Sequence, residues 1–399
     1  MILVKQIAEL NEIISGPRNE YIDKWKDDGK QVVGYFCSYV PVELLSAAGI
    51  LPVRLRGAGS TDSGSADVFM SSRTCTYVRH VMTLVLKGRY DFLDGEICLN
   101  TCDHVRRCFD LFRHKTSVGF HEFISVPRNV RESLYPYFRE EIENIKSAIE
   151  SYFSVEINDQ ALKAAISVHN KVRRRLARID QFRAAQKPIL TGADLLIITV
   201  ASQLMPAADF IDRAELILAA LESEQPGIEE PRARIMLSGG EMDDPGFVQA
   251  VESHGGVVVA DSLCTGMRAC QGLVDEDAAD YIDALSRRYF FQVHCARMIG
   301  NFPDRVADML NTIEDRKIDG VVFQRLKFCD PWGGEAHNLR HRLKKHDIPL
   351  LVLEREYGLV NSGQVKTRIQ AFMEMIESKT RRASKNAKVQ QSEENPHAR

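Results

Sequence analysis

The sequence lacks a strong charge of one sign and a long apolar run. Its 399 residues carry a formal net charge of -3, so there is no electrostatic reason to expect nucleic acid or a membrane surface as partner. No apolar run approaches the roughly 20 residues that span a bilayer. The opening stretch carries Lys5, Glu9 and Glu12 among its apolar residues, which is typical of an amphipathic helix and not of a signal peptide. We therefore expect a cytoplasmic protein with a small ligand.

Motifs of several enzyme classes are also missing. There is no GxxxxGK[ST] P-loop, and the segment Gly57-Ala-Gly59-Ser-Thr-Asp-Ser-Gly64 departs from the GxGxxG spacing of a dinucleotide loop. Neither GxSxG nor HExxH occurs, so a serine hydrolase and a zincin have no support. The chain itself is not expected to hydrolyse ATP.

The nine cysteines include no CxxC pair. An odd number of widely spaced cysteines in a large chain argues against a disulfide framework. The spacing of Cys98, Cys102 and Cys108 does not match a zinc finger or ribbon. These side chains are therefore thiols, metal ligands or core residues.

Short buried-strand patterns alternate with helical ones in both halves of the chain, which favours parallel sheets covered on both faces. We predict an α/β fold with two doubly wound, flavodoxin-like domains and a helical layer between them. The expected divisions are residues 1–130, an α/β domain; 131–225, the helical segment; 226–377, a second α/β domain; and 378–399, a disordered polar tail. The expected strands are 31–37, 51–55, 94–99, 118–126, 233–237, 256–260, 320–326 and 349–353.

A basic stretch, His169-Asn-Lys-Val-Arg-Arg-Arg-Leu-Ala-Arg, lies within the helical segment. Such a run is typical of a solvated helix face. The alternative is a contact with the phosphates of coenzyme A.

Three cysteines fall at expected helix starts or just after expected strands, namely Cys75, Cys102 and Cys329. Open α/β sheets bind ligands beyond the carboxyl ends of their strands. A helix N-terminus also favours the thiolate, which is the form that ligates metals. A single cysteine is more often a small core residue, but the shared placement of these three makes a common metal site the alternative. Cys98, Cys108, Cys270 and Cys295 are interpreted as core.

The chain resembles the superfamily of 2-hydroxyacyl-CoA dehydratases and benzoyl-CoA reductases. The resemblance runs across nearly the whole sequence, and the order and separation of its segments make it specific. The matching segments are GYFCSYVPVELLSAAGILPVRL, the helix that begins at Cys75, YDFLDGEICLNTCD, DSLCTGMR, FQRLKFCDPWGGE, LEREY and QVKTRIQAF.

This resemblance implies that Cys75, Cys102 and Cys329 hold a [4Fe-4S] cluster with one iron open to water or to a substrate thioester. It also implies an acyl-CoA substrate, a partner subunit of similar fold or a second copy of the chain, and a separate ATP-hydrolysing iron–sulfur activator. Two departures leave the subunit type open. The family's Pro-Glu-Glu is Pro41-Val42-Glu43 here, and the proline common after the first ligand is Thr76.

Five further residues are candidates for the site. Ser38 and Tyr39 follow the first strand and can hydrogen-bond the thioester, or they are plain turn residues. Glu43 either handles a proton or only complements the dipole of its helix. Arg268 is a candidate ligand for the substrate or a coenzyme A phosphate. Trp332 offers a flat wall to an aromatic ring or packs the floor of the crevice.

We expect a catalytic subunit of a benzoyl-CoA reductase-type enzyme, because Trp332 and the segments around Cys329 and LEREY resemble that branch more closely. The alternatives are a 2-hydroxyacyl-CoA dehydratase subunit, an iron–sulfur protein that only transfers electrons, and a two-domain binding module without metal.

Overall fold

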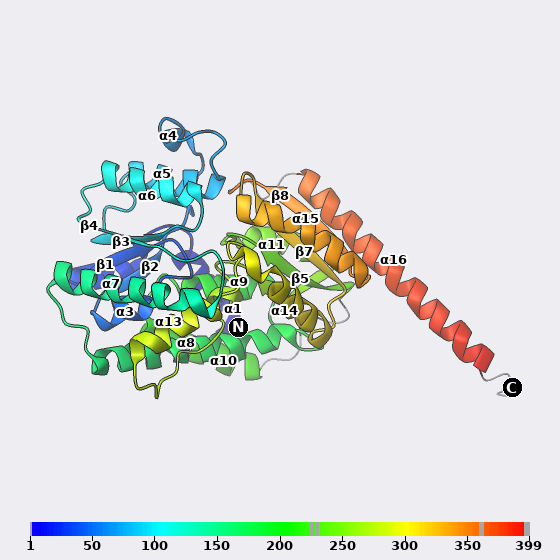
Figure 1. Cartoon of the computed structure of the whole chain (residues 1–399). Coiled ribbons are helices and arrows are strands. Elements are labelled where there is room, and N and C mark those ends of the chain that lie inside the picture. The colour runs from blue at the N-terminus through cyan, green and yellow to red at the C-terminus, as the bar shows by residue number, and fades with distance from the viewer. Residues whose placement is uncertain (1, 224–226, 229–230, 359–362, 395–399) are drawn as a thin grey trace.

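The computed structural model describes residues 2–223, 227–228, 231–358 and 363–394, and they form two parallel sheets clothed in helices (Figure 1). This confirms the predicted α/β class with two doubly wound sheets. Each expected strand is present within a few residues of its predicted bounds.

The first sheet has the strand order β2-β1-β3-β4, and all its pairings are parallel. Val33 of β1 lies opposite Pro52 of β2 and Gly95 of β3. All four residues of β1 are buried, as expected of a central strand covered on both faces. The strands are β1 (Val32–Tyr35), β2 (Leu51–Arg54), β3 (Gly95–Leu99) and β4 (Phe120–Ile124).

The second sheet repeats this topology with the order β6-β5-β7-β8, again all parallel. In each sheet the chain leaves the first strand toward one edge and then crosses to the other side. The topological switch point therefore lies between β1 and β3 in one sheet and between β5 and β7 in the other. The strands are β5 (Ala233–Gly239), β6 (Gly256–Ser262), β7 (Gly320–Leu326) and β8 (Leu350–Arg355).

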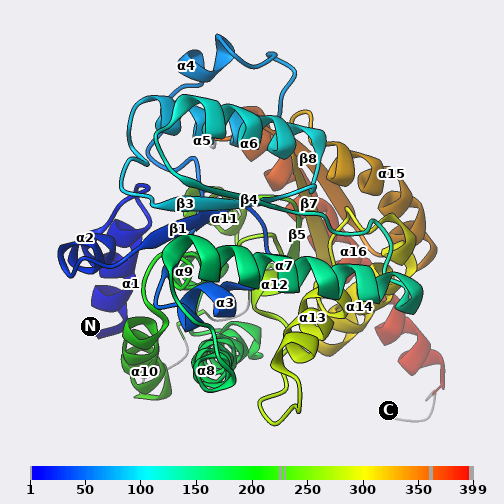
Figure 2. The same ribbon diagram turned by 60° about the vertical axis from the view of Figure 1, so that its left-hand side comes forward.

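Helices cover both faces of the first sheet (Figure 2). Two of them, α5 and α6, lie on one face, and α3 and α7 lie on the other. The helices in this half are α1 (Ile2–Ile13), α2 (Glu20–Asp27), α3 (Val42–Ala47), α4 (Gly64–Asp67), α5 (Thr76–Leu86), α6 (Asp103–Lys115) and α7 (Tyr135–Phe153).

Helices also cover both faces of the second sheet. Helices α9, α11 and α16 share one hydrophobic core with it, and α13, α14 and α15 share another. Each core continues into the first half of the chain, so the two sheets share their cores. The remaining helices are α8 (Asp159–Ala184), α9 (Gly192–Ala201), α10 (Ala207–Ser223), α11 (Pro245–Glu252), α12 (Met267–Cys270), α13 (Tyr281–Phe291), α14 (Phe302–Asp315), α15 (Asp330–Lys345) and α16 (Gly363–Glu394).

The expected helical segment consists of α7 to α10, but its helices divide between the sheets. Helix α7 packs on β4, whereas α9 packs on β6 and α11. The 26-residue α8 contacts α3 in one half and β6 in the other, and so ties the halves together. These helices therefore serve as covering layers of both sheets.

The basic stretch of α8 is largely engaged in ion pairs. Arg174 pairs with Glu276, Arg175 with Glu215 and Arg178 with Glu222, while Arg173 is buried. A carboxylate already neutralises each of these arginines, so the solvated-face interpretation is favoured over a phosphate site.

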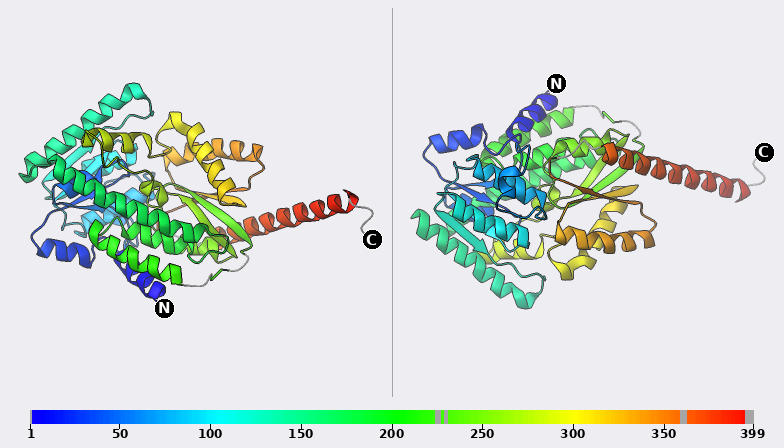
Figure 3. Two further views of the ribbon diagram at one scale, coloured as in Figure 1. Left: turned by 90° about the horizontal axis from the view of Figure 1, so that it is seen from below. Right: turned by 90° about the horizontal axis from the view of Figure 1, so that it is seen from above.

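The expectation of a disordered tail from residue 378 differs from the structure, in which α16 continues to Glu394 and extends away from the body (Figure 3). Among the side chains of α16 that the structure describes, the buried ones include Ile369, Phe372 and Ile376. Beyond Ile376 the sequence is rich in residues of high helix propensity, and an ion pair joins Glu377 to Arg381 four positions on. These local preferences favour a helix in a segment of low apolar content.

Removing residues 378–399 is expected to leave folding intact, because the ion pairs lost are exposed, Lys379–Asp347 and Arg381–Glu377. Such pairs contribute about 0–1 kcal/mol. The melting temperature should fall by less than about 3 °C, whereas Phe372→Ala in the buried half should cost about 3–5 kcal/mol. Thermal unfolding of the three proteins tests this, and a fall from truncation as large as that of Phe372→Ala would contradict it.

Candidate functional site

A cavity of about 90 Å³ lies where the two switch points face each other. Cys37 and Ser38 enter it from the end of β1, and Cys102 follows β3. From the second sheet, Glu241 follows β5 and Cys329 follows β7. The carboxyl ends of both sheets therefore converge on one enclosed space, which we call the switch-point cavity.

The three cysteines predicted as ligands all line the switch-point cavity. Each stands at the N-cap of a helix: Cys75 before α5, Cys102 before α6 and Cys329 before α15. The backbone N–H of Cys75 donates to Nδ1 of His104 at 3.2 Å, which holds the start of α5 against α6. Residues far apart in sequence are thereby collected at one point.

The thiols affect one another electrostatically. Burial raises the pKa of Cys75 to about 12, and the nearby Cys102 adds to this rise. Burial likewise raises the pKa of Cys329 well above its usual value, with Cys75 and Cys102 contributing in the same direction. Backbone N–H groups at the helix starts oppose these shifts, Tyr77 and Val78 for Cys75 and Trp332 for Cys329. Three such thiols ionise together only when a cation compensates their charge.

Cysteine thiols are the most frequent candidate metal ligands among the residues that line the cavity. In the described part of the chain, no group of three or more His, Cys, Asp and Glu side chains is placed to hold one metal ion. A cluster distributes its cysteine ligands over different irons, so its thiolates stand farther apart. Three thiols around one cavity, with helix N-termini directed at them, fit this arrangement.

Three more cysteines line the same cavity, Cys37, Cys264 and Cys295. The first two follow β1 and β6, where the ligand-edge rule could have found them. Cys295 is buried in the hydrophobic core, as expected, but it lies in the loop after α13 and not on a helix. Cys98 and Cys108 are fully buried in the hydrophobic core, as expected.

Ser38 and Tyr39 both line the cavity, as their position after β1 predicted. The Ser38 hydroxyl donates to the carbonyl of Cys264 at 3.1 Å and accepts from Arg54 at 3.2 Å. Tyr39 is completely buried, and its hydroxyl donates to the carbonyl of Val293 at 2.7 Å. Burial raises the pKa of Tyr39 well above its usual value, so it stays a neutral phenol.

Arg268 and Trp332 form one stacked unit in the cavity wall. The Arg268 guanidinium lies 4.4 Å from the centre of the Trp332 ring. Its Nη2 donates to the carbonyls of Gly239 and Ser262, while Nε and Nη1 are buried without a hydrogen-bond partner among the described residues. Trp332 is only 5% exposed and also packs on Phe323, so a substrate ring cannot reach the ring face that Arg268 covers.

Sequence reasoning missed several polar residues of the cavity, among them Arg54, Thr101 and Arg297. Arg54, the last residue of β2, donates to Glu241 at 3.1 Å. Arg297 donates to the carbonyl of Val126 at 2.8 Å. The Nε atoms of Arg54 and Arg297 and the hydroxyl of Thr101 are buried and unpaired within the described structure. Arg54 at the end of β2 and Thr101 just after β3 stood at the ligand edge of the sheet and carried that sequence signal, whereas Arg297 lies in a loop and carried none.

Glu43 lies outside this site. It is completely buried and accepts from Arg173 at 2.5 Å and from the Tyr289 hydroxyl at 2.7 Å. Burial would raise the pKa of Glu43, but Arg173, His169, Arg288 and Tyr289 together lower it to about 2. A carboxylate held ionised in this way is a poor proton carrier at neutral pH, so the geometry favours a structural role over the catalytic role we expected.

Comparison with known proteins identifies related chains. A family model described as 2-hydroxyglutaryl-CoA dehydratase, D-component, matches residues 37–376. The putative dehydratase subunit YjiM of Escherichia coli (strain K12) is 26% identical over 88% of this chain and 93% of its own. The (R)-phenyllactyl-CoA dehydratase beta subunit of Clostridium sporogenes is 23% identical over 93% and 99%.

A benzoyl-CoA reductase subunit of Thauera aromatica is 24% identical over 86% of this chain and 90% of its own. The relatives thus carry the names of both dehydratases and a reductase, and all are named as subunits. None of the described helices combines the length and apolar character needed to cross a membrane.

Proposed function

The chain belongs to the 2-hydroxyglutaryl-CoA dehydratase D-component family, and on that premise we propose that it is the [4Fe-4S]-bearing subunit of an (R)-2-hydroxyacyl-CoA dehydratase-type enzyme. The observation that carries the proposal is the placement of Cys75, Cys102 and Cys329 at three helix N-termini around one cavity. These three thiolates would hold the cluster. When bound, it would supply a low-potential electron and an iron that acts as a Lewis acid.

The chain's own residues would prepare the cavity for this chemistry. Arg268 and Arg54 present buried N–H groups without partners among the described residues, and these groups can stabilise negative charge that develops on a thioester oxygen. The Ser38 hydroxyl lies beside them, hydrogen-bonded to Arg54. The small, mainly apolar cavity leaves little room for water beside these groups, which strengthens each of these interactions.

A second candidate is the benzoyl-CoA reductase-type activity, which the likeness to the Thauera aromatica reductase protein favours. The stacking of Arg268 on Trp332 argues the other way, because Trp332 was the residue expected to face an aromatic ring. We therefore rank dehydration first and reduction second.

Partners follow from the same premise. The relatives are named as subunits, and the sequence has no P-loop. We therefore assign the chain a homologous partner subunit or a second copy, and a separate ATP-hydrolysing activator, all acting in the cytoplasm.

The two reactions differ in their need for electrons. Dehydration removes a hydroxyl and a proton as water and returns the electron, so one priming supports many turnovers. Reduction of the ring consumes two electrons and two protons in each turnover, so it needs a continuous ATP-coupled supply.

The test reconstitutes the protein with its partner and activator, primes the enzyme once, removes ATP, and follows a 2-hydroxyacyl-CoA and benzoyl-CoA separately. We expect continued loss of the hydroxyacyl thioester after ATP is removed. Conversion of benzoyl-CoA only under continuous ATP, with the hydroxyacyl thioester untouched, would overturn the dehydratase assignment in favour of the reductase. If neither compound reacts although four irons are bound, both assignments fail and an electron-transfer role remains.

A further inference from the structure

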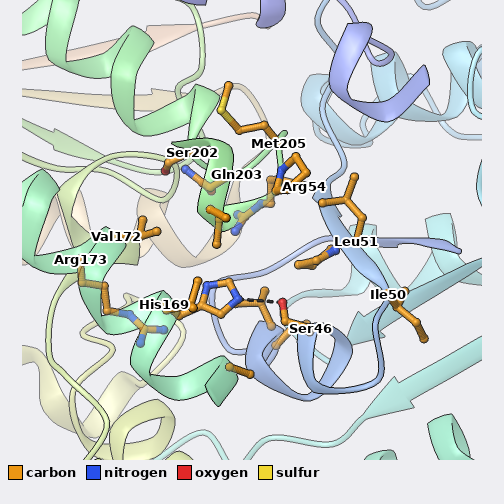
Figure 4. Close-up of a pocket in the computed structure, with 18 of the residues that line it drawn as sticks. Ser46, Ile50, Leu51, Arg54, His169, Val172, Arg173, Ser202, Gln203 and Met205 are labelled. Carbon is orange, nitrogen blue, oxygen red and sulfur yellow. Dashed lines mark hydrogen bonds between the residues drawn. The ribbon is translucent and has the colours of Figure 1, made fainter. Parts of the chain in front are cut away.

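A second, larger cavity of about 570 Å³ lies beside the first, between α3, α8, β2 and the turn from α9 to α10. Figure 4 shows its lining, with His169, Val172 and Arg173 on α8 and Ser46 on α3. Its size falls within the roughly 300–1,000 Å³ of small-molecule pockets. We call it the α3–α8 cavity.

The two cavities share part of their walls. Ser38 and Arg54 line both of them. Arg54 is anchored on one side by Glu241 and on the other by Ser38, and its Nε has no partner in the described structure. At about 90 Å³, the switch-point cavity is much smaller than the roughly 300–1,000 Å³ of small-molecule pockets and cannot hold a whole acyl-pantetheine arm. The adjoining space is therefore the natural place for the rest of such a molecule.

The lining of the α3–α8 cavity is chiefly apolar, with small side chains on α8 and α10. The Ser46 and His169 side chains of the lining are uncharged at neutral pH. Ser46 lies 2.8 Å from Nε2 of His169, and burial lowers the pKa of His169 to about 4, so this imidazole is neutral at pH 7. Residues of this lining include Ala47, Ala161, Ala164, Ala165, Val168, Val172, Leu176, Ala207 and Ala208.

The cationic residues of the lining are already engaged. Arg173 is paired with Glu43, and Arg288 donates to backbone carbonyls of Ala269 and Gln271. The only carboxylate in the lining, within the described residues, is Asp209, which would repel an anion. The cavity is thus suited to an uncharged, mainly apolar chain and unsuited to a phosphate.

Two buried polar atoms at its inner end offer a complementary pair. The backbone N–H of Arg54 donates to the Gln203 carbonyl at 3.0 Å, which places the two residues side by side. Nε of Arg54 and Oε1 of Gln203 are both unpaired in the part of the chain that is described. Figure 4 shows these two side chains close together in the cavity. One is a donor and the other an acceptor, which matches the two hydrogen-bonding ends of an amide or the carbonyl of a thioester.

We infer that the α3–α8 cavity binds the acyl-pantetheine arm of the thioester, with the thioester directed at Ser38 and Arg54 and the coenzyme A phosphates left at the mouth. The inference rests on the proposed function. It assigns substrate binding to this subunit itself and gives a role in it to Ser46, His169 and Gln203, none of which was a candidate site residue in the sequence analysis. The thioester carbonyl would then lie against Ser38 and Arg54, the residues that the two cavities share.

The test obstructs the cavity without touching the cluster. Ala164 is exposed at the mouth, and Val168 is half-buried one turn further along α8. Ala164→Trp and Val168→Phe should fill the space, while Ala177→Trp, at an exposed position of α8 outside the lining, is the matched control. The probes are butyryl-CoA, S-butyryl-pantetheine and adenosine 3′,5′-bisphosphate, titrated into the anaerobically purified holoenzyme by calorimetry.

Both butyryl thioesters should bind the unchanged protein and the Ala177→Trp control, and adenosine 3′,5′-bisphosphate should not compete with S-butyryl-pantetheine. In the two obstructed variants the Kd should rise about tenfold or more, because the introduced ring occupies the volume that the acyl-pantetheine arm needs. Iron content should be the same in all four proteins.

Equal Kd values in the control and the obstructed variants would overturn the inference, as would failure of the unchanged protein to bind S-butyryl-pantetheine. The iron content of the purified protein distinguishes failure of the cavity assignment from failure of the proposed function. A protein without iron that still shows the tenfold difference retains the cavity assignment and loses the dehydratase proposal. A protein with four irons and no difference loses only the cavity assignment.

Discussion

Cys75→Ser, Cys102→Ser and Cys329→Ser are each expected to remove most of the iron from the anaerobically purified protein, which should otherwise be brown and contain about four irons per chain. The three thiols line one cavity, and Cys102 contributes to the raised pKa of both Cys75 and Cys329, so the predicted site is incomplete when one thiol is lost. A serine hydroxyl is a much weaker iron ligand than a thiolate. Iron and sulfide analysis, with the visible absorption spectrum, measures the effect.

The controls are Cys98→Ser and Cys108→Ser. Both residues are fully buried, yet neither lines the switch-point cavity. Any general damage from placing a hydroxyl in the core would appear in these two as well, but they should keep their iron. Unchanged iron in all three ligand variants would refute the cluster assignment, and iron loss in the controls alone would point to a different set of ligands.

Arg173→Leu is expected to lower the free energy of unfolding by about 3–5 kcal/mol, because it leaves the Glu43 carboxylate buried without its main cation. The Glu43 side chain has 0% exposure and that of Arg173 has 7%. The pair joins α3 of the first sheet to α8, so it also holds one wall of the α3–α8 cavity in place. Denaturant unfolding monitored by circular dichroism gives the difference.

Arg174→Leu is the matched control, since Arg174 is the next residue of α8 but is 47% exposed in its pair with Glu276. It should cost about 0–1 kcal/mol. Equal losses from the two changes would show that burial of the pair has no special effect. In that case the structural role assigned to Glu43 would fail.

The same pair predicts the acid dependence of stability. The pKa of Glu43 is lowered in the folded state to about 2 from a usual value of 4.5. The resulting stabilisation is therefore fully present above about pH 4.5 and is lost as the pH falls toward 2. Glu43→Gln should flatten this part of the profile, whereas a catalytic proton carrier would instead leave its mark on the rate near neutral pH.

The cluster-ligand candidates could be located from sequence because their positions depend on local patterns. Short apolar runs such as 320–326 mark strands, and a cysteine at the following helix start lies at the ligand edge of the sheet. The same logic placed Ser38 and Tyr39 correctly in the cavity. The same logic grouped Glu43 with Ser38 and Tyr39, because Glu43 is only a few residues beyond Ser38. In the structure, the helix that carries Glu43 turns its side chain toward Arg173 of α8.

The sequence could not predict the role of a residue when that role depends on a contact with a residue far away in the chain. The partner of Glu43 lies 130 residues away on α8, and Arg268 and Trp332 cover each other. The polar tail was expected to be disordered, whereas α16 continues to Glu394, because low apolar content does not rule out a helix.

By itself, the sequence determined the strands, most covering helices, and the three cysteines at the carboxyl edges of two parallel sheets. Strand and helix periodicity and helix starts are local properties, written in neighbouring residues. Only the tertiary structure decided that the two edges face each other, that Arg54 and Ser38 stand between two cavities, and that Cys295 enters the site from a loop. Those facts depend on how α8 and the two shared hydrophobic cores bring the halves of the chain together. Packing between residues that are far apart in the chain produces no periodic pattern in the sequence from which it could be predicted.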